Sequence, residues 1–220
     1  DPSEDEAVFF EEDDTYYTFV YKTKPDKYIV IGSETTLDSE RRILEADNPS
    51  GNFRVFQPRQ YEEKLEYGIS HFQDRWYIRT NYQAENFRLM TCPEDQTGMG
   101  AWSEVIPHRE DVLLEGIDIF TDFLVITERI KGITQVRVRP WDGGEEHYID
   151  FPEEAHLVYP TSNKEFDTDH LRLGYQSMKT PPSIYDYDMK QRRLVLKKEQ
   201  EVVGAFDKKD YASERLFAKA

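Results

Sequence analysis

The sequence lacks the features of a secreted or disulfide-linked protein. Its single cysteine, Cys92, allows no internal disulfide in a chain of 220 residues. There is no Asn-X-Ser/Thr acceptor, since Asn48 is followed by Pro49, and no apolar run approaches a membrane span. The opening stretch, DPSEDEAVFFEEDD, has neither the basic nor the apolar region of a signal peptide. These absences favour a reducing, cytoplasmic location.

Basic residues are scarce beside acidic ones. The chain has 28 Lys and Arg against 44 Asp and Glu, a formal net charge of −16. A surface this negative repels phosphate backbones and anionic lipid headgroups, so we expect neither nucleic acid nor a membrane as partner. With 38% hydrophobic residues the chain can still bury a core.

Helical apolar spacing is also missing, whereas short aromatic and β-branched runs repeat at a fixed interval. DKYIVI begins at Asp26, DRWYIR at Asp74, DFLVIT at Asp122 and DHLRLG at Asp169, so the intervals are 48, 48 and 47 residues. Each copy lies between alternating strands. A unit of about 40–50 residues with four strands is typical of a propeller blade.

The sequence therefore predicts an all-β fold, a partial β-propeller of four four-stranded antiparallel blades. We place the blades at residues 15–58, 59–107, 108–152 and 153–200. The expected strands are Tyr16–Lys22, Lys27–Gly32, Glu40–Ala46, Phe53–Gln57, Leu65–Phe72, Arg75–Asn81, Asn86–Cys92, Trp102–Ile106, Leu114–Phe120, Phe123–Glu128, Thr134–Arg139, Glu146–Phe151, Ala155–Thr161, His170–Ser177, Ile184–Met189 and Arg193–Lys198.

The two ends do not fit a closed ring. Within residues 1–14, Ala7–Glu12 is expected to be a remnant outer strand of a preceding blade. Residues 201–220, with Val202–Phe206 and Glu214–Ala220, are expected to be a linker and a strand that leads into another domain. We interpret the chain as part of a larger protein, and we expect it to self-associate through the cut propeller edges.

Four segments carry a family resemblance: FRVFQPR from Phe53, YIRTNYQAENFRL from Tyr77, VIPHREDVLLEG from Val105 and GAFDKKDYASERLFA from Gly204. On these the chain resembles the oligopeptidase B (protease II) branch of the prolyl oligopeptidase family of serine peptidases. The resemblance implies the later blades of a seven-bladed propeller that caps an α/β-hydrolase domain with a Ser-His-Asp triad. It also implies cleavage of short peptides after Arg or Lys, without a cofactor.

No catalytic residue is expected in the chain itself. An α/β-hydrolase nucleophile requires Gly-X-Ser-X-Gly, and the nearest string, around Ser70, lacks the second glycine and lies in an alternating strand. The five histidines lack metal-ligand spacing, so no metal site is expected. Cys92 has no basic neighbour and is predicted to be an inert thiol. The four repeated aspartates are predicted to occupy equivalent turns, too far apart to act together.

The loops between the second and third strands of each blade share one face of a propeller. By resemblance that face abuts the catalytic domain, so Glu34, Asn81, Glu128 and Arg129 are the candidates for lining a substrate cavity or pairing across the domain interface. The alternative is that they are solvated turn residues without a partner.

The leading functional hypothesis is a propeller segment that gates and size-selects short basic peptides for a catalytic α/β-hydrolase domain of the same parent chain. The repeat alone would equally support a stand-alone β-propeller used as a protein-interaction scaffold. A propeller lyase or glycosidase would need carboxylates that converge at the ring centre, which a sequence does not reveal.

Overall fold

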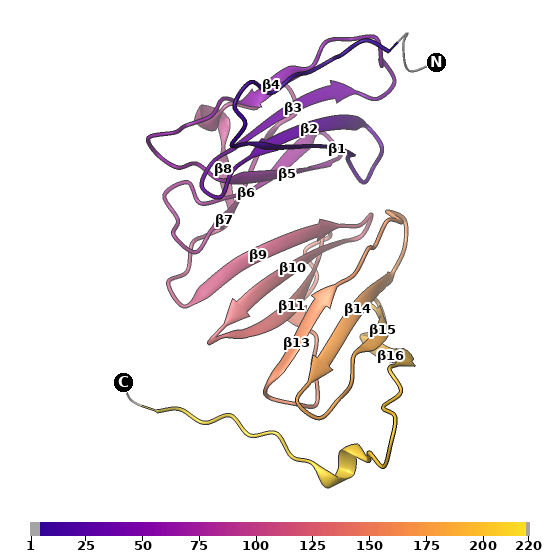
Figure 1. Ribbon diagram of the computed structural model, residues 1–220. Helices are drawn as coiled ribbons and strands as arrows, with labels where there is room; N and C mark the ends of the chain where they lie inside the picture. The colour runs from indigo at the N-terminus through magenta and orange to yellow at the C-terminus, as the bar shows by residue number, and fades with distance from the viewer. Residues whose placement is uncertain (1–4, 219–220) are drawn as a thin grey trace. The chain divides into compact units, whose positions relative to one another are not determined.

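The computed structural model describes residues 5–218 and is all-β (Figure 1). Sixteen strands form four four-stranded antiparallel sheets, each made from consecutive strands. Sheet A holds β1 (Tyr17–Lys22), β2 (Tyr28–Glu34), β3 (Ser39–Glu45) and β4 (Arg54–Gln57). Sheet B holds β5 (Tyr67–Phe72), β6 (Arg75–Thr80), β7 (Arg88–Pro93) and β8 (Ser103–Ile106).

The other two sheets follow in chain order. Sheet C holds β9 (Val112–Ile119), β10 (Phe123–Ile130), β11 (Ile133–Pro140) and β12 (His147–Tyr148). Sheet D holds β13 (His156–Pro160), β14 (His170–Ser177), β15 (Ser183–Asp188) and β16 (Arg193–Glu199). The expected strands are thus confirmed, although β12 is shorter than predicted. Only His147 and Tyr148 are ladder residues opposite β11, and beyond them the Ile149 N–H donates a last backbone hydrogen bond of 2.9 Å to the Val136 carbonyl.

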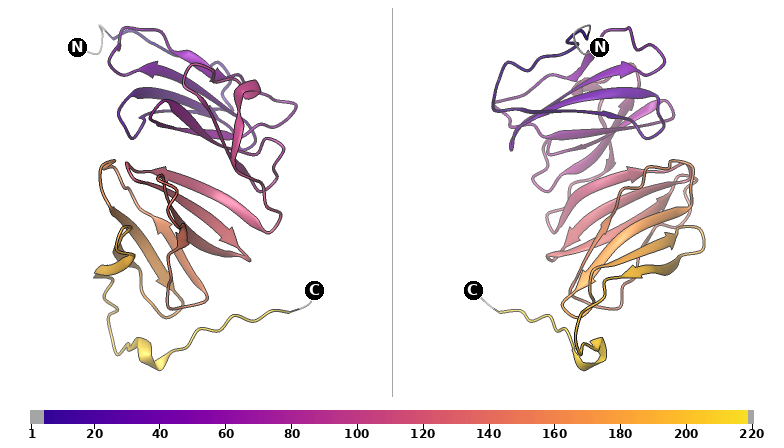
Figure 2. Two further views of the ribbon diagram at one scale, coloured as in Figure 1. Left: turned by 180° about the vertical axis from the view of Figure 1, so that it is seen from behind. Right: turned by 45° about the vertical axis from the view of Figure 1, so that its right-hand side comes forward.

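The chain forms two compact units, one with sheets A and B and the other with sheets C and D (Figure 2). In the first unit Trp76 of sheet B is fully buried. The centre of its ring lies 4.7 Å from that of Tyr28 and 5.2 Å from that of Phe56, both in sheet A, so these aromatic contacts join the two sheets. The second unit has a more aliphatic core. Its buried members include Val125, Val136, Val138, Val158, Leu171, Leu173 and Tyr175. In each unit the alternation of the strands supplies one apolar face per sheet.

A glycine and an aromatic residue face each other across the first two strands of sheet A. Phe19 on β1 is the cross-strand partner of Gly32 on β2. A Cβ placed on Gly32 would lie 2.5 Å from the phenyl ring, so only glycine lets the ring fold over the strand. Sheet D repeats the pair with Tyr159 over Gly174.

The repeated aspartates all lie in the connections between first and second strands, as predicted. Only Asp26 has the left-handed backbone expected of a tight turn, with φ of 63°; in sheet B that conformation belongs to Gln73. The expectation that the aspartates stay apart is wrong for one pair. Asp122 and Asp169 each lie 3.0 Å from the ammonium of Lys190, which bridges the turns of sheets C and D.

The predicted strands outside the four sheets are not found. Residues 7–12 pair with no strand of the described chain, and the acidic run from Glu11 to Asp14 disfavours a ladder. Residues 201–218 also contain no strand, and their regular structure is the short 3-10 helix η3 (Lys208–Asp210). Residues 219 and 220 of the predicted Glu214–Ala220 segment lie outside the described residues.

Candidate functional site

The candidate residues lie where the second strand meets the third in sheets A, B and C; this connection is shorter than predicted in sheets A and C and longer in sheet B. Glu34 is the last residue of β2, and Asn81 directly follows β6. Glu128 and Arg129 belong to β10, because this strand continues to Ile130. A two-residue turn then follows, with φ of 49° at Lys131 and 82° at Gly132, values typical of a hairpin.

Glu34 forms an ion pair within its own sheet. Its carboxylate accepts a hydrogen bond of 2.6 Å from Nη2 of Arg41, whose side chain is nearly buried. The Arg41 guanidinium also lies 5.1 Å from the ring centre of Phe19, a cation–π contact. Glu34 is therefore a partner of a sheet arginine, with 42% of its side chain still exposed.

Asn81 fixes the start of β5. Its Oδ1 accepts a 2.9 Å hydrogen bond from the Glu66 backbone N–H, and its Nδ2 donates to the Lys64 carbonyl at 2.9 Å. Nδ2 also lies 3.3 Å from the Glu66 carboxylate. Burial raises the pKa of Glu66, with Arg79 opposing the shift and Glu34 adding to it. Glu66 thus contacts Asn81 directly, whereas Glu34 affects it through like-charge repulsion.

Glu128 is fully buried and holds three donors. Arg137 donates to its carboxylate at 2.6 Å, the Tyr148 hydroxyl donates at 2.6 Å, and Arg109 forms a further ion pair. Arg137 also donates to both oxygens of Glu146, at 3.0 and 3.1 Å. A carboxylate enclosed in this way holds β10 to its neighbours and leaves little room to contact a ligand.

Arg129 points to the opposite face of β10 from Glu128, as neighbouring strand residues must. Its Nε donates to the Glu115 carboxylate on β9 at 2.7 Å, and Nη1 donates to the Gly132 carbonyl at 3.3 Å. With 40% of its side chain exposed, Arg129 remains the accessible candidate of this pair. The structure thus separates the two residues that the sequence placed together.

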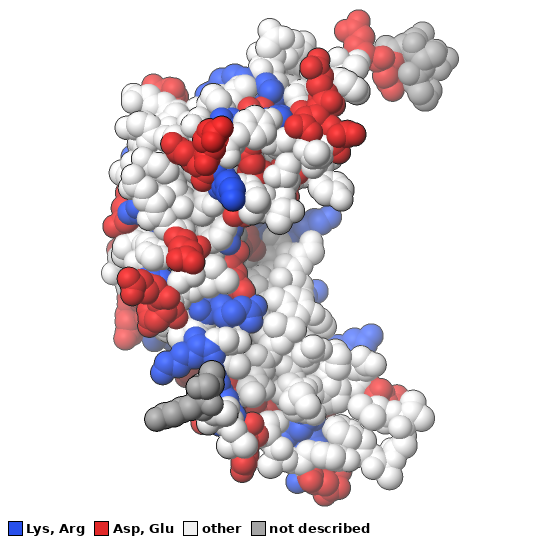
Figure 3. Space-filling model, turned by 60° about the vertical axis from the view of Figure 1, so that its left-hand side comes forward, with Lys and Arg blue, Asp and Glu red and all other residues white. Residues whose placement is uncertain are grey.

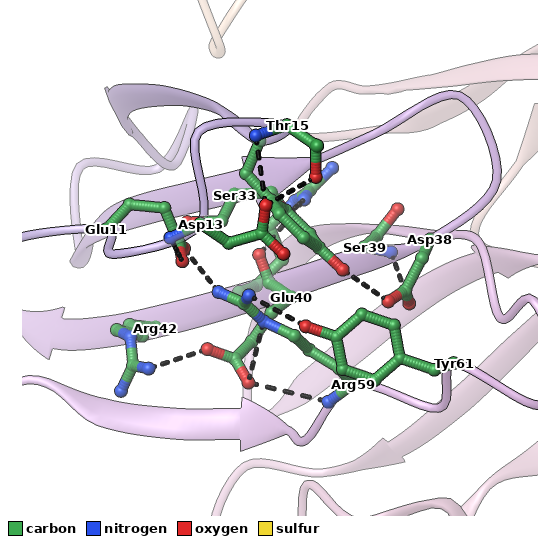
Figure 4. Close-up of polar contacts among 12 residues, drawn as sticks. Glu11, Asp13, Thr15, Ser33, Asp38, Ser39, Glu40, Arg42, Arg59 and Tyr61 are labelled. Atoms are coloured by element: carbon green, nitrogen blue, oxygen red, sulfur yellow. Dashed lines mark hydrogen bonds and ion pairs between the residues drawn. The ribbon is translucent and has the colours of Figure 1, made fainter.

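A polar cluster that the sequence analysis missed lies at the same end of sheet A (Figure 4). Arg59 forms ion pairs with Glu11 and with Glu40, the latter at 3.7 Å, while Arg42 donates to Glu40 at 2.6 Å. The hydrogen bond from Arg59 lowers the pKa of Glu11 against the opposing effect of burial. The cluster ties the segment before β1 to a residue 48 positions later.

Beside this cluster Tyr16 and Asp38 form a second contact, and Figure 4 shows Asp38 next to Ser39. The Tyr16 hydroxyl donates to Oδ2 of Asp38 at 2.6 Å, and the Ser39 backbone N–H donates to Oδ1 at 2.8 Å. Burial and the bond to Asp38 raise the pKa of Tyr16, so its hydroxyl remains a donor. The guanidinium of Arg59 lies 4.0 Å from the centre of the Tyr16 ring. A spacing signal for this site is absent from the sequence, because its residues come from three separate segments.

Ser70 and Cys92, the two potential nucleophiles discussed in the sequence analysis, both lie within strands of sheet B. Ser70 lies within β5, as predicted, and Cys92 is fully buried, with a pKa raised by burial to about 11. Residues 5–218 contain no group of three or more His, Cys, Asp or Glu side chains placed to hold a metal ion. Within the same range no helix is long and apolar enough to cross a membrane.

Acidic side chains are prominent on the surface. On the face drawn in Figure 3 they lie beside the N-terminal segment and also at the left edge and the lower end of the view, with basic side chains scattered among them. This distribution follows from the 44 acidic and 28 basic residues of the sequence. The resulting potential attracts cations and repels anions at this end of sheet A.

Comparison with known proteins gives consistent matches. A family model described as the prolyl oligopeptidase N-terminal beta-propeller domain matches residues 1–200. Dipeptidyl aminopeptidase BI of Pseudoxanthomonas mexicana is 38% identical over 219 residues, which cover 99% of this chain and 30% of that protein. Protease 2 of Moraxella lacunata is 28% identical over 218 residues, 99% of this chain and 31% of that protein.

The fold agrees with that of a solved oligopeptidase B structure. Oligopeptidase B from Leishmania major superposes with a TM-score of 0.86 at 26% identity, over 98% of this chain and 32% of that one. The chain therefore spans about 30% of the length of the curated relatives it matches. Its four antiparallel sheets correspond to propeller blades. The chain belongs to the N-terminal β-propeller family of the prolyl oligopeptidases.

Proposed function

We propose that this chain is the substrate-selecting propeller of a serine peptidase, which admits short peptides and excludes folded proteins. The match of residues 1–200 to the propeller family carries this proposal, together with the resemblance of the whole chain to regions of larger peptidases. The chemistry would be acyl transfer by a Ser-His-Asp triad on an α/β-hydrolase domain of the same parent chain. The chain contributes selection, and it has no Gly-X-Ser-X-Gly of its own.

We further propose that the substrates are basic peptides cut after Arg or Lys. The net charge of −16 supports this part, because an acidic surface raises the local concentration of cationic peptides. The stand-alone scaffold is less well supported, since the relatives that match nearly the whole chain are peptidases by name. A cytoplasmic location remains part of the proposal, in keeping with the single, buried cysteine.

A second candidate concerns where the peptide is cut. The relative at 38% identity is named a dipeptidyl aminopeptidase, which favours cleavage of dipeptides counted from a free amino terminus. The one at 28% is named a protease, which fits cleavage within a chain. The two alternatives differ in whether a free α-ammonium is required.

The test is a substrate panel on the full-length parent protein. Dipeptide fluorogenic substrates with Arg or Lys at the cleaved bond are compared with Leu or Glu there, each with a free and an acetylated amino terminus. Hydrolysis of the acetylated Arg substrate supports the endopeptidase, and hydrolysis of free-amine substrates alone supports the aminopeptidase. Turnover that is indifferent to Arg, Leu or Glu would refute the basic specificity. The 220-residue chain alone should be inactive on all of them.

A further inference from the structure

A cavity lined by tyrosines lies beside the connection between β2 and β3. Its volume is about 480 Å³, within the range of small-ligand sites. Tyr16, Tyr17 and Tyr61 contribute their rings, Leu37 adds an apolar side chain and Asp38 adds a carboxylate. Three of these are well exposed for apolar side chains: Tyr17 at 80%, Tyr61 at 59% and Leu37 at 49%. An exposed cluster of this kind is typical of a binding surface.

Asp38 supplies the negative charge of the cavity. Only 4% of it is exposed, and its two protein donors are the Tyr16 hydroxyl and the Ser39 N–H. Within residues 5–218 no Lys, Arg or His nitrogen lies within ion-pair distance of Asp38. A carboxylate has about four acceptor positions, so Asp38 retains capacity for donors from a ligand. A buried carboxylate without a cation is costly, and a cationic ligand would offset that cost.

The aromatic walls suit the same class of ligand. Tyr16 and Tyr61 meet edge to face, with ring centres 6.3 Å apart. The Tyr16 ring already contacts a guanidinium, since Arg59 lies 4.0 Å from its centre without lining the cavity. Cations prefer the faces of tyrosine rings, and desolvation strengthens the contact. The chain's own arginine therefore illustrates the kind of group that this wall accepts.

The charged residues that line the cavity are one of each sign, Asp38 and Lys64. Further acidic residues lie next to the lining residues in the sequence: Glu11, Glu12, Asp13 and Asp14 precede Thr15, and Glu62 and Glu63 lie between Tyr61 and Lys64. Arg59 forms an ion pair with Glu11. Asp38 is therefore the lining group that favours a cation, and Lys64 opposes it.

We propose that the cavity between Tyr16, Tyr61 and Asp38 binds a cationic group of a peptide, an alkylammonium or a guanidinium. The group is either the α-ammonium of an amino terminus or the side chain of Lys or Arg. Its charge pairs with Asp38, and its stem lies against the tyrosine rings and Leu37. That the ligand is a peptide rests on the proposed function; the cavity's preference for a cation does not.

Binding is tested on the 220-residue chain by NMR titration at low salt with four probes. N-acetyl-lysine methylamide and N-acetyl-arginine methylamide carry side-chain cations, glycinamide carries an α-ammonium, and N-acetyl-norleucine methylamide is the neutral match for lysine. We expect millimolar binding of at least one cationic probe, and about fivefold weaker binding of the norleucine probe, the change that roughly 1 kcal/mol produces. The preferred cationic probe identifies the source of the charge.

Variants of three cavity residues test how each side chain affects the affinity for the cationic probe. Asp38→Asn should weaken the best cationic probe about fivefold or more, while Lys64→Gln should strengthen it by removing a like charge. Tyr61→Leu, at an exposed ring, should weaken it without disturbing the core. Asp26→Asn is the matched control, since this aspartate is exposed and pairs with Lys22 away from the cavity. If Asp38→Asn does not fold, Tyr61→Leu and Lys64→Gln still test the site.

Equal binding of the lysine and norleucine probes would overturn cation recognition, as would unchanged binding in all three cavity variants. Each probe is added up to 50-fold the protein concentration, roughly the tens of millimolar at which such weak contacts saturate. If no probe binds in this range, the site itself is refuted. The outcome is independent of the substrate panel on the parent protein. A parent without peptidase activity would refute the proposed function even if the cavity binds cations, and a silent cavity in an active Arg-specific peptidase would refute only this site.

Discussion

Replacing Glu128 by Gln should destabilise the second unit strongly, because this carboxylate holds two arginines and a tyrosine while fully buried. Removing one member of a buried ion pair costs about 3–5 kcal/mol when the partner is left unpaired. Arg137 keeps Glu146, and Arg109 is one-third exposed, so each retains some compensation. We therefore expect a loss of about 2 kcal/mol in the free energy of unfolding, somewhat below that range.

The measurement is urea unfolding of the 220-residue chain, followed by far-UV circular dichroism and by hydrogen exchange of peptides from sheet C. Glu115→Gln is the control, since this residue forms the partly exposed ion pair with Arg129 on the neighbouring strand. It should cost less than about 1 kcal/mol. If Glu128→Gln and Glu115→Gln proved equally stable, burial would not be the source of the Glu128 contribution.

Three further outcomes are expected. Burial lowers the pKa of His71 in the folded chain, despite the nearby Glu94. The folded state therefore favours the neutral ring, and the free energy of unfolding should fall as the pH drops below the unfolded pKa of about 6.5. His71→Gln should flatten the pH profile of unfolding between pH 7.5 and 5.5, and an unchanged slope would contradict this. Gly32→Ala should cost about 1–3 kcal/mol in urea unfolding because its methyl group meets the Phe19 ring, whereas Gly68→Ala, which meets no atom within 4 Å, should not destabilise. Cys92, buried and with a pKa of about 11, should react with a disulfide reagent only at the rate of unfolding, and rapid labelling in native buffer would disprove its burial.

The sheets were predictable because their signals are local. Alternation along each strand and the aspartate repeat at Asp26, Asp74, Asp122 and Asp169 lie within short windows of sequence, and both the strands and the turns follow. Residues 7–12 pair with no strand of the described chain, because alternation alone supplies no partner and the one expected for this segment belongs to a preceding blade.

The site was less predictable because side-chain contacts depend on register. β10 continues two residues beyond its expected end, and its pairing with β9 shifts between Thr127 and Glu128. That shift places Glu128 inside and Arg129 outside, although both look like loop residues in the sequence. The contact of Glu11 with Arg59 spans 48 positions, and no spacing in the sequence links the two residues.

The N-terminal segment is attached in a different way from the rest of the chain. Glu11 pairs with Arg59, and the Phe9 ring lies 4.8 Å from the Arg42 guanidinium, while residues 5–12 join no β-ladder. A ladder fixes every residue between its ends, whereas two side-chain anchors fix only two points. Substitutions at residues 5–8, which lie outside both anchors, are therefore expected to leave β1 in place. A single change at Arg59, in contrast, would remove the Glu11 anchor and leave only the contact of Phe9 with Arg42.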